Sequence, residues 1–342
     1  MKKIKTEAAV GQVLVHDITR IIKDVVKDTP FRKGHIVQEE DIAVLLSLGK
    51  EHLYVWEADE DSLHENEAAQ ILYELCAGEH MKPSSVKEGK IEVIAEVDGL
   101  LESDVDRLCD INEVEDIMIA ARSHGSRIHA GDKIAGTRVI PLMVSRRKMD
   151  KVKELAGKTA LFQLREFKLK KAGVITTGSE VYKGRIQDTF TPVIEEKLKD
   201  YGIAMESHVI VPDDQELILQ AIQRMKELGM EMILCTGGMS VDPDDVTPSA
   251  IRASGAMIVS YGAPVLPGAM FLLGYFDDGT LICGLPGCVM YAKATVFDLV
   301  LPRMAAGIAI TKKDLAKLGN GGFCMQCDVC HYPNCGFGRE LL

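Results

Sequence analysis

The sequence has few aromatic residues, no surplus of basic residues and no long apolar run. Aromatic residues make up 5% of the 342 residues, and 51 Asp and Glu outnumber 40 Lys and Arg, which gives a formal net charge of -11. A chain this acidic lacks the basic face that nucleic acid requires, so we expect no nucleic-acid partner. No segment has the roughly 20 consecutive apolar residues of a membrane-spanning helix, so we expect no membrane association.

An apolar leader is also missing from the first residues, MKKIKTEAAVG, so we expect no secretory signal and a cytoplasmic protein. In a reducing compartment, clustered thiols more often bind metal than form disulfides. Five of the nine cysteines are scattered along the chain. The other four crowd the C-terminal part and are Cys324, Cys327, Cys330 and Cys335.

Four regions of the chain differ in their patterns. Residues 1–60 are expected to form an α+β segment, and residues 61–168 a β-rich middle region, because short alternating runs are typical of strands. Over residues 169–309, apolar strands alternate with amphipathic helices, and a Cys-rich tail follows at 310–342. The βαβ order predicts an α/β fold with a three-layer, mostly parallel sheet, preceded by the smaller α+β and β-rich regions.

Three strand–helix pairs are expected within the α/β region. They are a strand at 172–177 with a helix from Thr189, a strand at 203–211 with a helix opened by Asp213 or Asp214, and a strand at 231–236 with a helix capped by Thr247. A later turn at Pro286 is expected to open an apolar helix that ends near Pro302. In such sheets the ligand binds beyond the carboxyl ends of the strands.

Two glycine-bearing loops follow strands at this edge, TTG at 176–178 and TGG at 236–238. Glycine lets backbone N–H groups approach an anion without a Cβ in the way. A single loop of this kind often serves only to reverse the chain. Two loops on one edge of the sheet favour an anion-binding site.

Five acidic residues lie near these loops: Glu180, Asp188, Asp242, Asp244 and Asp245. They would repel a phosphorylated ligand unless a divalent cation lay between, and carboxylates with substrate phosphates are the usual ligands of Mg²⁺. Alternatively some form caps and turns, with Asp188 capping the helix at 189. We expect at least two of the five to contact metal or substrate, and Asp244 to be the one that does not.

Four stretches in this order, ITTGSEVYKGRIQDT, LCTGGMSVDPDDVTPSAI, APVLPGAM and GLPGCVMYA, resemble the molybdopterin-binding domain of molybdenum-cofactor biosynthesis proteins, including the molybdopterin molybdenumtransferases. The resemblance covers roughly residues 170–305. It implies binding of adenylylated molybdopterin, Mg²⁺-dependent insertion of molybdate with release of AMP, and a homodimer. The residues that it implies are catalytic Glu180 and Asp245, metal-binding Asp188 and Asp242, and substrate-binding Thr177, Gly178, Ser179, Thr236, Gly237, Gly238, Ser240, Thr247, Pro286 and Gly287.

The sequence departs from the family pattern at several positions. Ser179 stands where the family usually has Asp, Phe190 and Cys288 stand where it has Asn, and the Met-Asp-Gly-Tyr-Ala motif of the transferases has no counterpart. The loss of this last, acid-bearing motif favours a second hypothesis, a non-catalytic carrier or sensor that passes finished cofactor to a molybdoenzyme. A third is an enzyme like the nicotinamide-nucleotide hydrolases, against which no appended amidase module is visible.

The Cys-rich tail carries its own prediction. Cys324, Cys327 and Cys330 have the C-x2-C-x2-C spacing of bacterial ferredoxin runs, with Cys335 farther on and His331 between. Four or five Cys and His ligands also suit tetrahedral Zn²⁺. The spacing therefore predicts a [4Fe–4S] cluster or Zn²⁺, and the alternative is a reactive, disordered tail.

Overall fold

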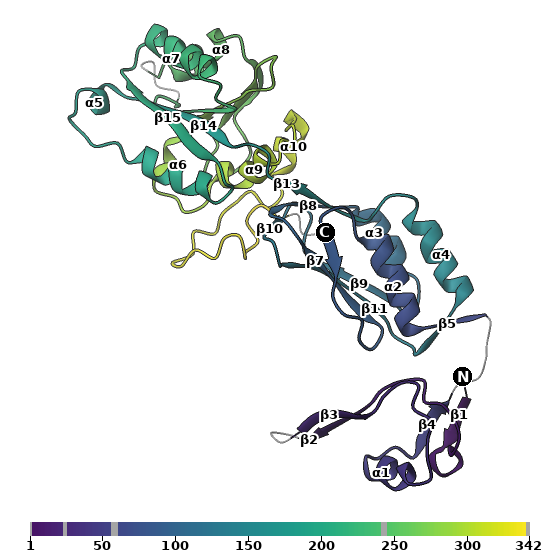
Figure 1. Cartoon of the computed structure of the whole chain (residues 1–342). Coiled ribbons are helices and arrows are strands. Elements are labelled where there is room, and N and C mark those ends of the chain that lie inside the picture. The colour runs from purple at the N-terminus through teal and green to yellow at the C-terminus, as the bar shows by residue number, and fades with distance from the viewer. Residues whose placement is uncertain (1, 23–25, 56–60, 241–244, 340–342) are drawn as a thin grey trace. The chain divides into compact units, whose positions relative to one another are not determined.

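The computed structural model describes residues 2–22, 26–55, 61–240 and 245–339 (Figure 1). The chain divides into two compact units, one from Met1–Val97 with Leu101–Leu164, and the other from Asp98–Leu100 with Arg165–Leu342. Both predicted glycine loops belong to the second unit.

The first unit contains a four-stranded antiparallel sheet with strand order β6-β7-β11-β9. Its elements are α2 (Glu65–Cys76), β6 (Met81–Pro83), β7 (Lys90–Ala95), α3 (Val105–Asn112), β9 (Ile117–Ala121), β11 (Lys133–Val139) and α4 (Arg146–Ala156). Alternate residues of β7 are buried, as expected of a sheet with one face on the core. Leu72, Ile111 and Val152 bring the three helices into the same core.

Shorter elements complete this part of the chain. They are β1 (Lys2–Lys5), η1 (Thr6–Ala8), β2 (Ile18–Ile22), β3 (Val26–Phe31), α1 (Asp41–Ser47), β4 (His52–Val55), β5 (Ser62–His64), β8 (Gly99–Ser103), β10 (Arg127–Ile128), β12 (Met143–Ser145) and β13 (Phe162–Glu166). The elements before residue 56 enclose a small core of their own around Leu14, Leu45 and Leu53.

The second unit is built on a six-stranded sheet of order β15-β14-β16-β19-β18-β17. Its strands are β14 (Lys171–Thr177), β15 (Ala204–Val211), β16 (Met232–Thr236), β17 (Met257–Tyr261), β18 (Leu272–Tyr275) and β19 (Leu281–Leu285). The first four strands in this order are parallel, and β18 and β17 are antiparallel. The predicted mostly parallel sheet is therefore confirmed, and the antiparallel pair at one edge is an addition that the sequence analysis did not anticipate.

Helices cover both faces of this sheet (Figure 1). One face carries α6 (Phe190–Lys199), α9 (Val296–Ala305) and α10 (Lys312–Lys317), and the other carries α7 (Gln215–Glu227) and α8 (Thr247–Ala253). Neighbouring residues of β14 point to opposite faces, with Val174 in the core under α6 and α9 and Ile175 in the core under α7 and α8. All five residues of β16 are buried, as expected of a central parallel strand.

The start of one helix agrees with the sequence and that of another does not. Asp214 caps α7, and its side chain accepts hydrogen bonds from two N–H groups of the first turn. The expected cap at Thr247 is wrong, because α8 begins at Thr247 itself and Val246 holds the N-cap position. The Thr247 hydroxyl lies instead 3.1 Å from that of Thr177, so it is engaged outside its own helix.

Helix α9 (Val296–Ala305) begins later and ends later than predicted. It starts where Thr295 and Asp298 form a capping box. It then continues through Pro302, which has no N–H to donate to the carbonyl four residues earlier, that of Asp298. The Tyr332 hydroxyl donates a hydrogen bond to this Asp298 carbonyl oxygen at 2.9 Å. The tail therefore supplies the hydrogen bond that the proline removes from the helix.

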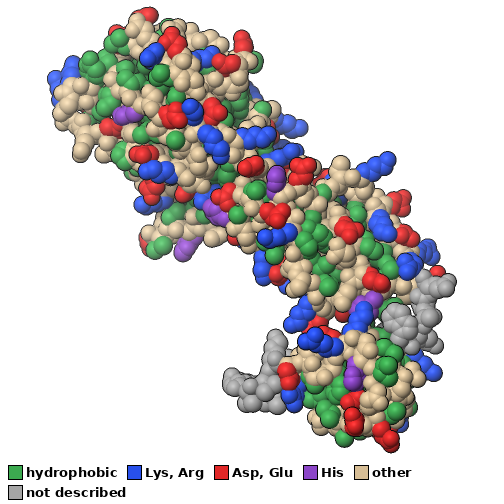
Figure 2. All heavy atoms as spheres, in the orientation of Figure 1, with side chains coloured by type: hydrophobic (Ala, Val, Ile, Leu, Met, Phe, Trp, Pro, Cys, Tyr) green, Lys and Arg blue, Asp and Glu red, His purple; other side chains and the backbone are tan. Residues whose placement is uncertain are grey.

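Charged side chains are interspersed over the surface. On the face drawn in Figure 2, acidic and basic side chains alternate over both units. Within the described ranges, no helix is both long enough and apolar enough to cross a membrane.

Candidate functional site

The two predicted glycine loops meet at the carboxyl edge of the parallel strands. Gly237 has a φ of +85°, and a Cβ there would overlap the carbonyl oxygen of Thr177 and lie 2.8 Å from its hydroxyl. Gly238 has a φ of +53°, and a Cβ there would lie 2.8 Å from the hydroxyl of Thr247. Gly237 is therefore required by the close approach of the second loop to the end of β14, and Gly238 by its close approach to the start of α8.

The first loop is held by an acidic residue from a third strand end. After Gly178, whose φ is +144°, the short helix α5 (Ser179–Tyr182) begins, and the Ser179 N–H donates to Asp213 Oδ2 at 2.7 Å. Asp213 lies two residues after the end of β15, and its other oxygen lies 3.7 Å from where a Cβ of Gly238 would be. One carboxylate therefore lies against both glycine loops.

The second loop is held by a tyrosine from the antiparallel edge of the sheet. The Tyr261 hydroxyl donates to the carbonyl oxygens of Met239 at 2.9 Å and Ser240 at 3.3 Å. Partial burial raises the pKa of this phenol, so it stays a donor at neutral pH, and the Arg252 guanidinium lies 5.3 Å from the ring centroid. Ser240 itself is exposed.

Asp188 lies immediately before α6 and accepts four internal hydrogen bonds. Its Oδ1 accepts from the N–H groups of Phe190 at 2.9 Å and Thr191 at 3.2 Å. Its Oδ2 accepts from the hydroxyls of Thr191 at 2.6 Å and Thr176 at 3.1 Å. This arrangement fits the alternative interpretation in which Asp188 caps the helix, and its role as a metal ligand stays a prediction.

A histidine completes this polar cluster. His208 Nε2 lies 3.0 Å from the hydroxyls of Thr176 and Thr191 and 3.3 Å from Asp188 Oδ2. Burial alone would raise the pKa of Asp188, but the hydrogen bonds, first of all from Thr191, hold it below its usual value. Asp188 is therefore an ionised acceptor that fixes α6 against β14 and β15.

One buried hydroxyl beside this cluster has no partner. Thr236 ends β16 opposite Thr176 in the sheet, is fully buried, and its Oγ1 has no hydrogen-bond partner within the described residues. On its other side Leu285 ends β19, followed by the buried Pro286 and by Gly287, which begins η2 (Gly287–Met290). The third predicted turn thus lies beside the second loop, and the Thr236 hydroxyl is free to bond a ligand there.

The predicted metal ligands are not gathered into a cluster. Glu180 is exposed on α5, Asp245 is half-buried, and Asp242 lies outside the described residues. Across 2–22, 26–55, 61–240 and 245–339, no three His, Cys, Asp or Glu side chains are close enough to hold one metal ion. In the tail, Cys324 and Cys335 are half-buried, and Cys327 and Cys330 are exposed.

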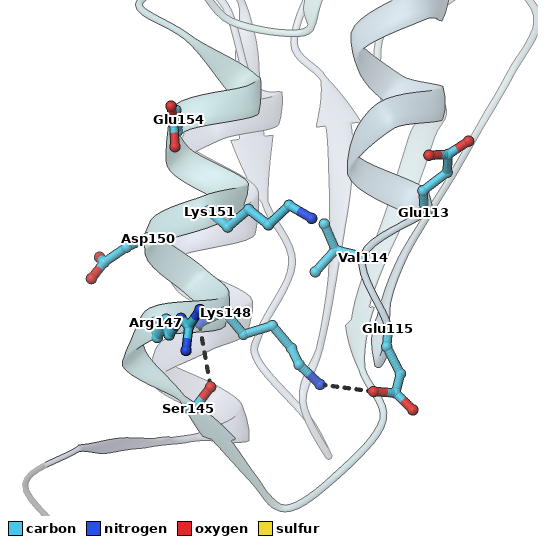
Figure 3. A pocket seen from close by; sticks show the side chains of 9 residues that line it. All are labelled: Glu113, Val114, Glu115, Ser145, Arg147, Lys148, Asp150, Lys151 and Glu154. Carbon is cyan, nitrogen blue, oxygen red and sulfur yellow. Dashed lines mark hydrogen bonds and ion pairs between the residues drawn. The ribbon is translucent and has the colours of Figure 1, made fainter.

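A surface hollow in the first unit is a weaker candidate for the ligand site. Figure 3 shows the residues that line it: Glu113, Val114, Glu115, Ser145, Arg147, Lys148, Asp150, Lys151 and Glu154. Lys148 Nζ lies 2.5 Å from Asp116 Oδ2 and 3.5 Å from Glu115 Oε2, and the bond to Asp116 raises the pKa of Lys148. Four acidic and three basic side chains line it, and Lys148 is already paired with two carboxylates, so the loops of the second unit stay the candidate ligand site.

The sequence analysis missed three residues of this site. Asp213 lies two residues after the end of a predicted strand, so the rule that selected the glycine loops would also have selected it. His208 and Tyr261 lie within strands and reach the loops through their side chains. No local pattern distinguishes these two from residues of an ordinary strand.

Comparison with known proteins agrees with this placement. Residues 173–306 match a family model described as the probable molybdopterin binding domain. They belong to this domain family. The matched range contains both glycine loops, Asp188, His208, Asp213 and Tyr261. Residues 3–57 match a second model, described as a domain of unknown function.

Relatives of the molybdopterin-binding domain carry different names. A CinA-like protein of Leptospira borgpetersenii is 35% identical over 82 residues, which are 23% of this chain and 20% of that protein. A molybdopterin molybdenumtransferase of Synechococcus elongatus is 25% identical over 143 residues, which are 39% of this chain and 36% of that protein. The chain therefore spans well under half the length of these relatives.

Two solved structures are similar to part of this chain. The molybdopterin biosynthesis enzyme MoaB of Thermus thermophilus is 24% identical, covers 41% of this chain and 98% of its own, and has a TM-score of 0.35. The molybdopterin biosynthesis Mog protein of Mycobacterium ulcerans is 23% identical, covers 41% of this chain and 99% of its own, and also has a TM-score of 0.35.

Proposed function

We propose that the molybdopterin-binding domain binds adenylylated molybdopterin and, with Mg²⁺, catalyses insertion of molybdate with release of AMP. The observation that carries the proposal is the meeting of the glycine loops, where Gly178, Gly237 and Gly238 adopt positive φ at the carboxyl edge of the sheet. Backbone N–H groups arranged in this way bind phosphate oxygens, and this edge is where α/β sheets bind ligands. Gly178 and Ser240 lie in the same two loops and belong to the proposed phosphate site.

Mg²⁺ fits the acidic side chains around these loops. It is usually held by one or two carboxylates together with substrate phosphates, so a protein cluster of three ligands is not required. Glu180 and Asp245 are the proposed residues that hold it or orient water at the phosphoanhydride, and Asp188 and Asp242 are the proposed additional ligands. When bound, the cation would neutralise phosphate charge.

Other residues act on this site by fixing it. Asp213 holds the Ser179 N–H and therefore the start of the first loop. Tyr261 holds the carbonyls of the second loop, and the unpartnered Thr236 hydroxyl offers a hydrogen bond to a polar group of the ligand. A site fixed before the ligand arrives loses less freedom on binding.

A carrier or sensor of the finished cofactor is the second candidate. It is favoured by Ser179, which stands where the transferases have Asp and therefore leaves the first loop with one carboxylate fewer. The homodimer and delivery to a molybdoenzyme belong to both proposals, and light scattering of the purified chain tests the dimer.

The deciding experiment follows AMP release. The full chain is incubated with adenylylated molybdopterin, molybdate and Mg²⁺, and the same assay is run with Glu180→Ala, Asp245→Asn and the control Glu196→Ala, which removes an exposed glutamate from α6. We expect release by the unaltered chain and the control, and at least a tenfold lower rate in the other two variants. Tight binding without any AMP would instead support the carrier, and no binding would overturn both candidates.

A further inference from the structure

The cysteine tail, residues 320–339, lies against the molybdopterin-binding domain with its two ends held. At the first end, the Leu266 N–H donates to Gly322 O and the Cys324 N–H donates to Leu266 O, both at 2.8 Å. Near the second end, Phe337 is only 6% exposed and belongs to the core under α9. The Gly338 N–H donates to Gly321 O at 2.9 Å, so the two ends also contact each other.

A hydrogen bond from the tail to α9 fixes the tail between Cys330 and Cys335. The Tyr332 hydroxyl bonds the Asp298 carbonyl oxygen that Pro302 leaves unpaired, and the ring lies edge-on to Phe337 with centroids 6.2 Å apart. Cys324 and Cys335 are partly buried against the same core. Two of the four thiols therefore have positions fixed by the domain.

The segment between Cys324 and Tyr332 has no buried core of its own. Met325 and Val329 are 81% and 66% exposed, Phe323 just before it is 73% exposed, and Cys327 and Cys330 are also exposed. Residues 324–339 contain no helix and no strand, and every one of them is described. A segment with large exposed apolar side chains gains little by burial, so its order has to come from another interaction.

A backbone donor lies against the sulfur of the first cysteine. The Gln326 N–H donates to Cys324 Sγ at 3.5 Å, and Gln326 has a φ of +52°, a conformation that residues other than glycine seldom adopt. Hydrogen bonds of this kind are also made to the sulfurs of metal clusters. The turn therefore already has one feature of sites that bind metal through sulfur.

We propose that Cys324, Cys327, Cys330 and Cys335 together bind one metal centre that prefers thiolates, and that the exposed segment folds inward as they do. The shared thiolate chemistry fits Zn²⁺ and a [4Fe–4S] cluster alike. Within the described residues the four thiols are not yet gathered. Cys327 and Cys330 are exposed, so they move without breaking a buried contact, whereas Cys324 and Cys335 serve as the fixed half of the site.

Metal analysis of the full chain tests this centre. Protein purified without oxygen is reconstituted either with Zn²⁺ alone or with Fe²⁺ and sulfide, and bound metal is then measured per chain. Cys327→Ser/Cys330→Ser removes the two exposed tail thiols. Cys109→Ser is the matched control, because Cys109 is also exposed but lies in α3.

We expect one Zn²⁺ or one cluster per chain in the unaltered protein and in the control, and at least a tenfold loss in the double variant. Bound metal should also slow protease cleavage between residues 324 and 335. The arm that retains metal identifies the centre. Equal metal content in the double variant, or a disulfide with no metal in the unaltered chain, would overturn the proposal. AMP release, which depends on other residues, stays informative in either case.

Discussion

The glycine loops and the cysteine tail lie in the same unit but are fixed in different ways. At the loops, buried contacts among Thr177, Asp213 and Thr247 hold the backbone without any ligand. In the tail, contacts hold the two ends and Tyr332, and the cysteines Cys327 and Cys330 are exposed. The difference indicates that the first site is formed by folding, whereas the second is completed by what it binds.

The largest effect is expected from a substitution that disrupts the contact between the two glycine loops. Gly237→Ala places a Cβ onto Thr177 at a positive φ, and we expect it to destabilise the second unit by about 3 kcal/mol or more and to abolish ligand binding. Gly229→Ala is the control, since Gly229 has a φ of +74° but open space around its Cβ position, and should cost about 1 kcal/mol. Scanning calorimetry measures both. Equal costs would show that the contact between the loops does not matter.

The next effect concerns the helices that support both sites. Lys197 of α6 is paired with the carboxylate of Asp298 in α9, and both side chains are almost fully buried. Lys197→Met should cost about 3 kcal/mol, because it leaves the Asp298 carboxylate buried without its cation. Lys199→Met removes an exposed pair with Glu195 and should cost at most about 1 kcal/mol. Chemical denaturation measures the free energy of unfolding of both variants. A smaller loss of stability in Lys197→Met than in Lys199→Met would show that the buried pair does not stabilise the fold.

A smaller effect is expected from a substitution that weakens the docking of the tail and leaves the glycine loops unchanged. Tyr332→Phe removes the hydrogen bond to the Asp298 carbonyl and should weaken docking of the tail by about 1 kcal/mol, or about a fivefold increase in its undocked fraction. Limited proteolysis of the tail should accelerate accordingly, while ligand binding at the loops stays unchanged. Tyr291→Phe, at a residue that is 74% exposed, should change neither. A loss of ligand binding in Tyr332→Phe would show that the two regions are not independent.

The smallest effect appears only in acid. The hydrogen bonds to Asp188 lower its pKa in the folded protein, so the folded state keeps the carboxylate ionised where the unfolded chain takes up a proton. Its contribution is fully present above the unfolded value of about 4 and is lost as the pH falls through the lower folded value. The stability gap between the unaltered protein and Asp188→Asn should therefore narrow below about pH 4. A stability difference between the unaltered protein and Asp188→Asn that grows in acid would show that folding does not lower the pKa of Asp188.

Much of the second unit could be predicted from sequence because its strands and helices are marked locally. The buried run of β16 and the Asp214 cap of α7 are visible within a few residues. The position of both glycine loops on one edge was also expected, because parallel strands end at the same edge.

What sequence did not show depends on contacts between distant residues. Thr247 has the chemistry of a cap, but its hydroxyl bonds Thr177, 70 residues away. Tyr261 looks like any strand tyrosine until β17 pairs antiparallel at the edge and brings its hydroxyl to Met239. Pro302 was predicted to lie near the end of a helix. No nearby residue indicates that Tyr332, 30 residues later, donates the hydrogen bond that the proline cannot make.

That last contact has an evolutionary consequence. A proline in the middle of α9 is tolerable while Tyr332 is present, and a tyrosine in the tail has this use only while the proline leaves a carbonyl open. The two positions should therefore change together among relatives that share both helix and tail. Relatives that end near residue 306, before any such tail, should carry a residue with an N–H at position 302.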